Sequence, residues 1–126
     1  MNTRHRAILD LLVEKKEVAV TLLAERLGVS GVTIRQDLSQ LEQQGFVKRV
    51  HGGAVLNDTD DISTRMVFHY NHKLNIARQA ALIVEDGETV LIEAGSTNAL
   101  VAKEIVKQKK NVTIITPNVF IARELR

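Results

Sequence analysis

The chain has 126 residues, of which 44% are hydrophobic and 25% are charged, the composition of an ordinary soluble globular protein. It contains no cysteine, which excludes a disulfide framework and cysteine-based metal sites or nucleophiles. The formal net charge is only +2, and all of the excess lies in residues 1–56, where eight Lys/Arg stand against six Asp/Glu. A charge this small does not by itself imply a nucleic-acid partner, so the pattern of residues has to decide.

The first 56 residues are predicted to fold in the order helix, strand, helix, turn, helix and hairpin. A helix-turn-helix needs a small residue where its helices cross, a glycine in the turn, and an aliphatic residue that points back into the junction. Ala24, Gly28 and Ile34 stand at those three positions. The runs FVKRV and AVL flank HGG and are predicted to form a wing. We therefore expect a winged helix-turn-helix over residues 1–56.

The third predicted helix begins at Ser30, whose hydroxyl is a good N-cap, and buries Ile34, Leu38 and Leu41 at spacing i, i+4, i+7. The second helix of such a pair lies in the major groove of DNA, with its first residues at the base edges. Hydroxyls and the free N–H groups of the first turn suit phosphates, arginine suits a phosphate or a guanine edge, and glutamine suits adenine. The candidate DNA contacts on this helix are Ser30, Gly31, Thr33, Arg35, Gln36, Ser39 and Gln40.

The predicted wing adds basic residues next to this helix. Its candidate DNA contacts are Lys48, Arg49, His51 and Gly52, and Arg4 and Arg6 are candidates for further phosphates. The alternative interpretation is a winged-helix domain that binds protein and has a solvated polar face. The cap, the turn glycine, the apolar spacing and the basic hairpin agree with one another and favour DNA.

The stretch VTLLAERLGVSGVTIRQDLSQLEQQGFVKRVHGGAV resembles the DNA-binding domain of the DeoR family of bacterial sugar-metabolism repressors. The matching motifs are Ser-x-x-Thr-Ile-Arg-x-Asp-Leu at 30–38 and Arg-x-His-Gly-Gly-Ala at 49–54. Gln36 stands where the family usually has a second arginine, which implies a less basic recognition surface. The resemblance implies an operator-binding repressor of a carbohydrate operon, homo-oligomeric when intact, with galactitol operons as the first candidates.

Residues 57–64, NDTDDIST, are polar and acidic and are predicted to be a linker. A long helix is expected to follow, from about Met66 to Val84, with Ile76, Ala80 and Ile83 on its apolar face and Ala77 and Ala81 beside it. TVLIEA and NVTIIT are nearly continuous apolar runs, typical of parallel strands buried on both faces. Residues 65–126 are therefore predicted to form an α/β domain.

The segment EAGSTN lies where the first of these strands gives way to a helix. Ligands of open α/β sheets bind at the carboxyl ends of strands, and a helix N-terminus attracts phosphate. The candidate effector-binding residues are Lys73, Glu93, Gly95, Ser96, Thr97, Asn98, Thr116 and Asn118. The alternative is an ordinary strand-to-helix loop in which Ser or Thr only caps the helix.

The resemblance continues here, because residues 65–105 are similar to the opening of the family's effector domain. That domain resembles sugar-phosphate isomerases and typically senses a phosphorylated sugar or sugar alcohol. The fold class expected is thus α+β, a winged helix-turn-helix followed by an incomplete, isomerase-like α/β domain. Family members are about twice as long, so we expect a truncated form.

An alternative for this half is the remnant of a sugar-phosphate isomerase-like enzyme. Glu93 lies at a strand end but has no convincing acid/base partner in the sequence. We therefore expect no enzyme, no catalytic residue, no metal and no cofactor. No apolar run approaches the roughly 20 residues of a membrane span and no secretory signal opens the chain, so we expect a cytoplasmic protein without a membrane partner.

Overall fold

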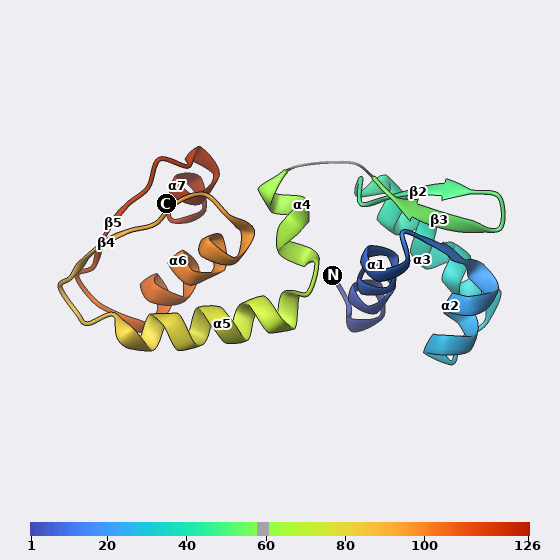
Figure 1. Cartoon of the computed structure of the whole chain (residues 1–126), viewed down its shortest axis with the longest axis horizontal. Coiled ribbons are helices and arrows are strands. Elements are labelled where there is room, and N and C mark those ends of the chain that lie inside the picture. The colour runs from blue at the N-terminus through green and yellow to red at the C-terminus, as the bar shows by residue number, and fades with distance from the viewer. Residues whose placement is uncertain (58–60) are drawn as a thin grey trace. The chain divides into compact units, whose positions relative to one another are not determined.

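The computed structural model describes residues 1–57 and 61–126, and the contacts within the chain divide it into two units, Met1–Asp60 and Asp61–Arg126 (Figure 1). The elements of the first unit are α1 Thr3–Lys15, β1 Glu17–Ala19, α2 Val20–Leu27, α3 Gly31–Gln43, β2 Val47–Val50 and β3 Gly53–Leu56. Those of the second are α4 Ile62–Val67, α5 Tyr70–Ile83, β4 Thr89–Leu91, α6 Ser96–Gln108, β5 Thr113–Ile115 and α7 Val119–Glu124. The expected mixture of helices and strands is confirmed.

The sheet of the first unit is antiparallel and has the order β1-β3-β2. The predicted hairpin is present, with Arg49 of β2 opposite Ala54 of β3. On its other side β3 pairs with β1, where Val18 lies opposite the same Ala54. The wing therefore forms a three-stranded sheet with β1, and the end of β3 next to its turn is paired with the residues that lead into α2.

The two glycines of the wing have different structural tasks. Gly52 has φ +73°, a conformation that side-chain-bearing residues rarely adopt, and its carbonyl accepts a hydrogen bond from Val20 N at 2.8 Å. Gly53 lies so close to β1 that a Cβ atom there would stand 2.3 Å from Val18 O. The Gly-Gly pair thus permits both the turn and the close approach of the strands.

The core of the first unit is aliphatic and draws on all of its elements. It places Ile34, Leu38 and Leu41 of α3 at zero exposure, as the i, i+4, i+7 pattern predicts. The other buried apolar residues are Ile8, Leu9, Leu12, Val18, Val20, Leu23, Val47 and Ala54. Gly28 ends α2 in the left-handed conformation, φ +66°, so the predicted turn is confirmed.

The single helix predicted from Met66 to Val84 is wrong, because the chain forms α4 and α5 with a break between them. Phe68 is extended and His69 is left-handed, with φ +52°, although neither is glycine or proline. The linker predicted over 57–64 also needs correction. Residues 62–64 belong to α4, since Ile62 and Met66 pack against the core of the second unit; residues 58–60 lie outside the described residues.

The apolar face predicted for the long helix is wrong as well. Ile76 and Ile83 are 56% and 81% exposed, whereas Ala77 and Ala81 are fully buried. Helices α5 and α6 lie side by side (Figure 1), and Ala81 shares one core cluster with Ala99 and Ala102 of α6. Small side chains let two helices approach closely, so this pairing turns the alanines inward and the larger residues outward.

The predicted parallel strands are present, since β4 and β5 pair with Leu91 opposite Ile115. Burial on both faces is wrong. Ile92 is 5% exposed, and Val90 and Ile114 pack on the core cluster, but Leu91 and Ile115 are 68% and 54% exposed on the other face. The sheet of the second unit therefore has one covered face and one open face.

We predict that Gly53→Ala lowers the free energy of unfolding of the first unit by about 3 kcal/mol, because the added methyl group meets the backbone of β1 and no flexible side chain can yield. Gly52→Ala is the matched control. Open space surrounds Gly52, so only the conformational strain of about 1–2 kcal/mol applies. Urea unfolding followed through the amide NMR signals of residues 1–57 measures both values, and equal losses would contradict the close approach.

Candidate nucleic-acid interface and effector loop

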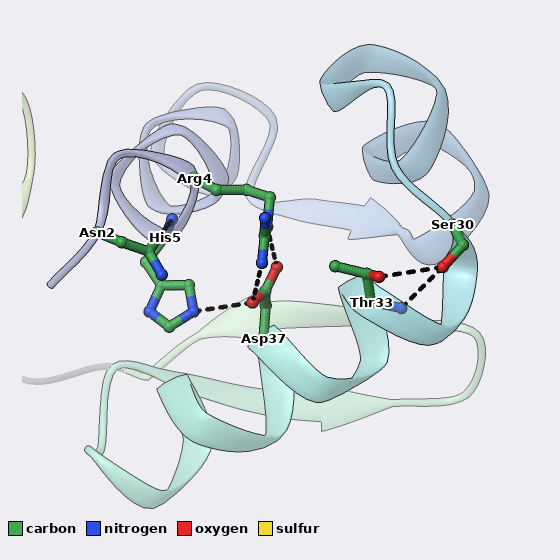
Figure 2. Close-up of polar contacts among 6 residues, drawn as sticks. All are labelled: Asn2, Arg4, His5, Ser30, Thr33 and Asp37. Atoms are coloured by element: carbon green, nitrogen blue, oxygen red, sulfur yellow. Dashed lines mark hydrogen bonds and ion pairs between the residues drawn. The ribbon is translucent and has the colours of Figure 1, made fainter.

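Helix α3 begins with the cap that the sequence predicts. The Ser30 hydroxyl accepts a hydrogen bond from Thr33 N at 3.2 Å, and the two hydroxyl oxygens lie 3.1 Å apart (Figure 2). Ser30 is exposed and Thr33 is half-buried, and their hydroxyls sit at the N-terminus of a 13-residue helix, where the partial positive charge of the helix dipole lies. This end of α3 therefore offers hydroxyl and N–H groups to an anion.

The inner side of α3 carries one charged residue, Asp37, which is only 4% exposed. Its carboxylate accepts hydrogen bonds from Arg4 Nε at 2.5 Å and Arg4 Nη2 at 2.9 Å, and His5 Nε2 lies 3.0 Å from the same carboxylate (Figure 2). The His5 backbone N–H in turn donates to the Asn2 side chain, which caps α1. The start of α1 is thus bound to the middle of α3.

Arg4 binds Asp37 through one edge of its guanidinium, formed by Nε and Nη2, so the phosphate contact predicted for Arg4 would have to come from its remaining N–H groups. The hydrogen bond from the Arg4 guanidinium is the main cause that lowers the pKa of Asp37 below its usual 3.8; burial opposes the shift and His5 assists it. Asp37 is therefore a carboxylate at neutral pH. The sequence held no sign of this pair, since 33 residues separate its partners.

The outer face of α3 forms a shallow hollow of about 400 Å³. Four of the residues predicted to contact DNA line it, together with one that was not among them: Arg35, Gln36, Ser39, Gln40 and Val32. These positions follow the spacing i, i+3, i+4, i+7, i+8 and form one stripe, opposite the buried stripe. The spacing in the sequence already places Val32 on this face, although it was not predicted to contact DNA.

The Arg35 side chain lies back over the start of α3. A Cβ atom built at Gly31 would stand 3.3 Å from Arg35 Nη1, so the absence of a side chain at Gly31 leaves room for the guanidinium. The structure therefore brings Arg35 beside Gly31, one residue from the Ser30 cap. A cation and the first free N–H groups of the helix meet at this point.

The wing is joined to α3 by hydrogen bonds. Arg49 donates through its backbone N–H to Glu42 at 2.8 Å and through Nη1 to the Ser39 hydroxyl at 3.2 Å. Ser39 itself donates to the Arg35 carbonyl at 2.9 Å. The remaining predicted wing contacts are exposed on β2 and at the turn: Lys48, His51 and Gly52. Helix and wing thus present one continuous polar surface.

In the second unit, the predicted effector residues fall into separate groups. Lys73 Nζ of α5 donates to the Ser96 hydroxyl at 3.1 Å and to the Arg65 carbonyl at 2.5 Å, so an ammonium group lies at the N-terminus of α6. Ser96 is 5% exposed. Gly95, with φ +152°, precedes it, and Thr97 follows in the first turn of α6.

The other predicted effector residues make contacts of their own. Asn98 donates from its side chain to the Glu93 carbonyl at 3.2 Å, which closes the loop, while the Glu93 side chain is exposed. Thr116 and Asn118 line a hollow of about 370 Å³ together with Ala122 of α7. The Asn118 side chain also caps α7, because it accepts a hydrogen bond from Ile121 N. In residues 1–57 and 61–126, no cluster of His, Asp and Glu suits a metal ion.

Comparison with known proteins decides the family. Residues 4–60 match the DeoR-like helix-turn-helix domain, and residues 68–126 match the DeoR C terminal sensor domain. The chain belongs to the DeoR family. The DeoR-type resemblance seen in the sequence is thus confirmed over both units. Among the described residues, no helix of this DeoR-family chain is both long and apolar enough to cross a membrane.

Its curated relatives are regulators of transcription. GolR of Listeria innocua, named an HTH-type transcriptional regulator, is 37% identical over 98% of this chain and 50% of its own length. The transcriptional repressor AccR of Agrobacterium fabrum is 34% identical over 97% of this chain and 48% of its own. The L-fucose operon activator of Escherichia coli is 34% identical over 97% of this chain and 52% of its own length. The chain spans about half the length of these DeoR-family relatives.

We predict that Asp37→Asn lowers the free energy of unfolding of the first unit by about 2 kcal/mol at pH 7, because it removes the charge that Arg4 and His5 bind. The pKa of Asp37 is lowered on folding, so this contribution is present above the unfolded value of 3.8 and is lost as the pH falls through the lower folded value. The variant and the unchanged protein should therefore converge in acid.

Urea unfolding at pH 7 and at pH values below 3.8, followed through the NMR signals of residues 1–57, measures this difference. Glu25→Gln is the control, because it removes an exposed carboxylate of α2 from the same unit. A deficit of Asp37→Asn that stayed constant with pH would show that the carboxylate charge is not the stabilising feature.

Proposed function

We propose that this chain is the DNA-binding and ligand-sensing part of a cytoplasmic transcriptional repressor of a carbohydrate-utilisation operon. The observation that carries the proposal is the outer face of α3, where the polar stripe lines one hollow beside the wing. A helix of this kind fits the major groove, with Gln36 placed to read adenine and Arg35 to bind a phosphate or a guanine edge. The wing residues Lys48 and Arg49 then face the neighbouring backbone.

One winged unit binds few phosphates, so useful affinity needs paired half-sites. The exposed cations on the outer face of α3 and on the wing are Arg35, Lys48 and Arg49. We propose that the intact regulator is a homo-oligomer whose winged units bind two half-sites of an operator. The relatives named as a repressor and as the activator of an L-fucose operon support regulation of transcription and, in the second case, of a sugar operon.

We further propose that the effector is a phosphorylated sugar or sugar alcohol that binds at the N-terminus of α6. Three features support this site: the Lys73 ammonium group, the Ser96 hydroxyl beside it, and the first N–H groups of α6. A phosphate bound there replaces the Ser96 oxygen as the partner of Lys73. Binding at this loop would weaken the hold on the operator. No catalytic role is assigned to these residues.

We predict that Arg35→Ala weakens binding to duplexes selected from a randomised pool by about 1–3 kcal/mol. Three phosphate contacts per unit give a slope of log affinity against log salt of about −2.7, and the variant's slope becomes about −1.8 if Arg35 binds a phosphate. A loss confined to certain base pairs would instead assign Arg35 to a guanine edge.

The matched control for this measurement is Arg78→Ala, which removes the same charge from an exposed position on α5. It should leave the binding of selected duplexes unchanged. Equal losses for Arg35→Ala and Arg78→Ala would contradict the proposed interface. Binding with no salt dependence would favour the protein-binding alternative for the winged unit.

For the proposed effector site at the N-terminus of α6, we predict that a sugar phosphate at ten times its Kd stabilises the second unit by about 1.4 kcal/mol. The free sugar should not stabilise it. Lys73→Met should abolish the effect and Ser96→Ala should reduce it, because both remove a phosphate partner. Lys107→Met, at the exposed far end of α6, is the matched control and should leave it intact. Thermal unfolding with a panel of sugar phosphates measures the shift, and a shift that survived Lys73→Met would place the ligand elsewhere.

A further inference from the structure

Val32 is an exposed apolar side chain on a polar surface. It is 62% exposed, and among the described residues of the first unit the other exposed large apolar side chain is Met1, at 43%. Single exposed apolar residues are common on proteins and need no explanation by themselves. The position of Val32 is what gives it meaning, because it stands at the second residue of α3.

Val32 begins the stripe that continues through Arg35, Gln36, Ser39 and Gln40, and it lines the same hollow. The first residues of a recognition helix are those that reach base edges. Valine is branched at Cβ and has one strongly preferred rotamer in a helix, so its two methyl groups are held in one place. The outer face of α3 therefore carries a rigid apolar side chain close to the N-terminus of the helix.

We propose that Val32 reads the 5-methyl group of a thymine in the major groove, an inference that rests on the proposed DNA-binding function. Thymine is the base that carries a methyl group in that groove, and apolar side chains are its usual partners. Gln36 lies four residues further along α3, about 6 Å of helix, which corresponds to roughly two base-pair steps. The thymine is thus no more than about two base pairs from the adenine that Gln36 reads.

The test selects duplexes from a randomised pool with the full chain and with the variants Val32→Ala and Gln36→Ala. Each thymine of the enriched sequence is then replaced, one at a time, by deoxyuridine, which lacks only the 5-methyl group. We expect one replacement to weaken binding of the unchanged chain about fourfold, the effect of one buried methyl group. The same replacement should have no effect on Val32→Ala, whose selection should also lose that thymine.

The matched control is Val106→Ala, which shortens a valine that is 52% exposed on α6 of the other unit and should select the same sequence as the unchanged chain. Two results would overturn the inference: no deoxyuridine replacement weakens binding, or Val32→Ala still responds to the replacement. If the unchanged chain enriched no sequence, the proposed function would fail and the inference with it, whereas a normal selection with no role for Val32 leaves the function standing.

Discussion

The ion pair between Arg4 and Asp37 is the constraint on which the proposed recognition surface depends. An apolar stripe such as that of α3 tolerates some rotation of the helix about its axis, because hydrophobic contact has no direction. Hydrogen bonds from two nitrogens of Arg4, together with the contact from His5 to the same carboxylate, do have direction. They hold α3 against α1 at one rotation, and the residues opposite Asp37 are presented outward as a result.

This arrangement also explains why the surface is only weakly basic. Arg4 is paired with Asp37, the Arg49 guanidinium donates to the Ser39 hydroxyl, and Gln36 stands where a second arginine is usual in the family. A surface with few unshared cations gains less from phosphate contacts and depends more on short-range contacts with base edges. An adaptable amide and a rigid apolar side chain are suited to that kind of reading.

The sequence predicted the features that local spacing determines and missed those that distant segments determine. Gly28, the Ser30 cap and the buried stripe of α3 follow from residues within one or two turns of each other. The partner of Asp37 lies on another helix, and nothing near Asp37 indicates it. On α5 the spacing of isoleucines predicted the wrong face. The face that packs against α6 carries small alanine side chains, and the larger isoleucines are exposed.

These small side chains explain the geometry of the proposed effector site at the N-terminus of α6. Lys73 lies one helical turn before the fully buried Ala77 on α5, and Ser96 lies one turn before Ala99, which is 1% exposed, on α6. Larger residues at these alanines would hold the two helices further apart, and the 3.1 Å contact between Lys73 and Ser96 would open. This site therefore depends on the covered side of the second unit, where α5 meets α6, and not on the open face around Leu91 and Ile115.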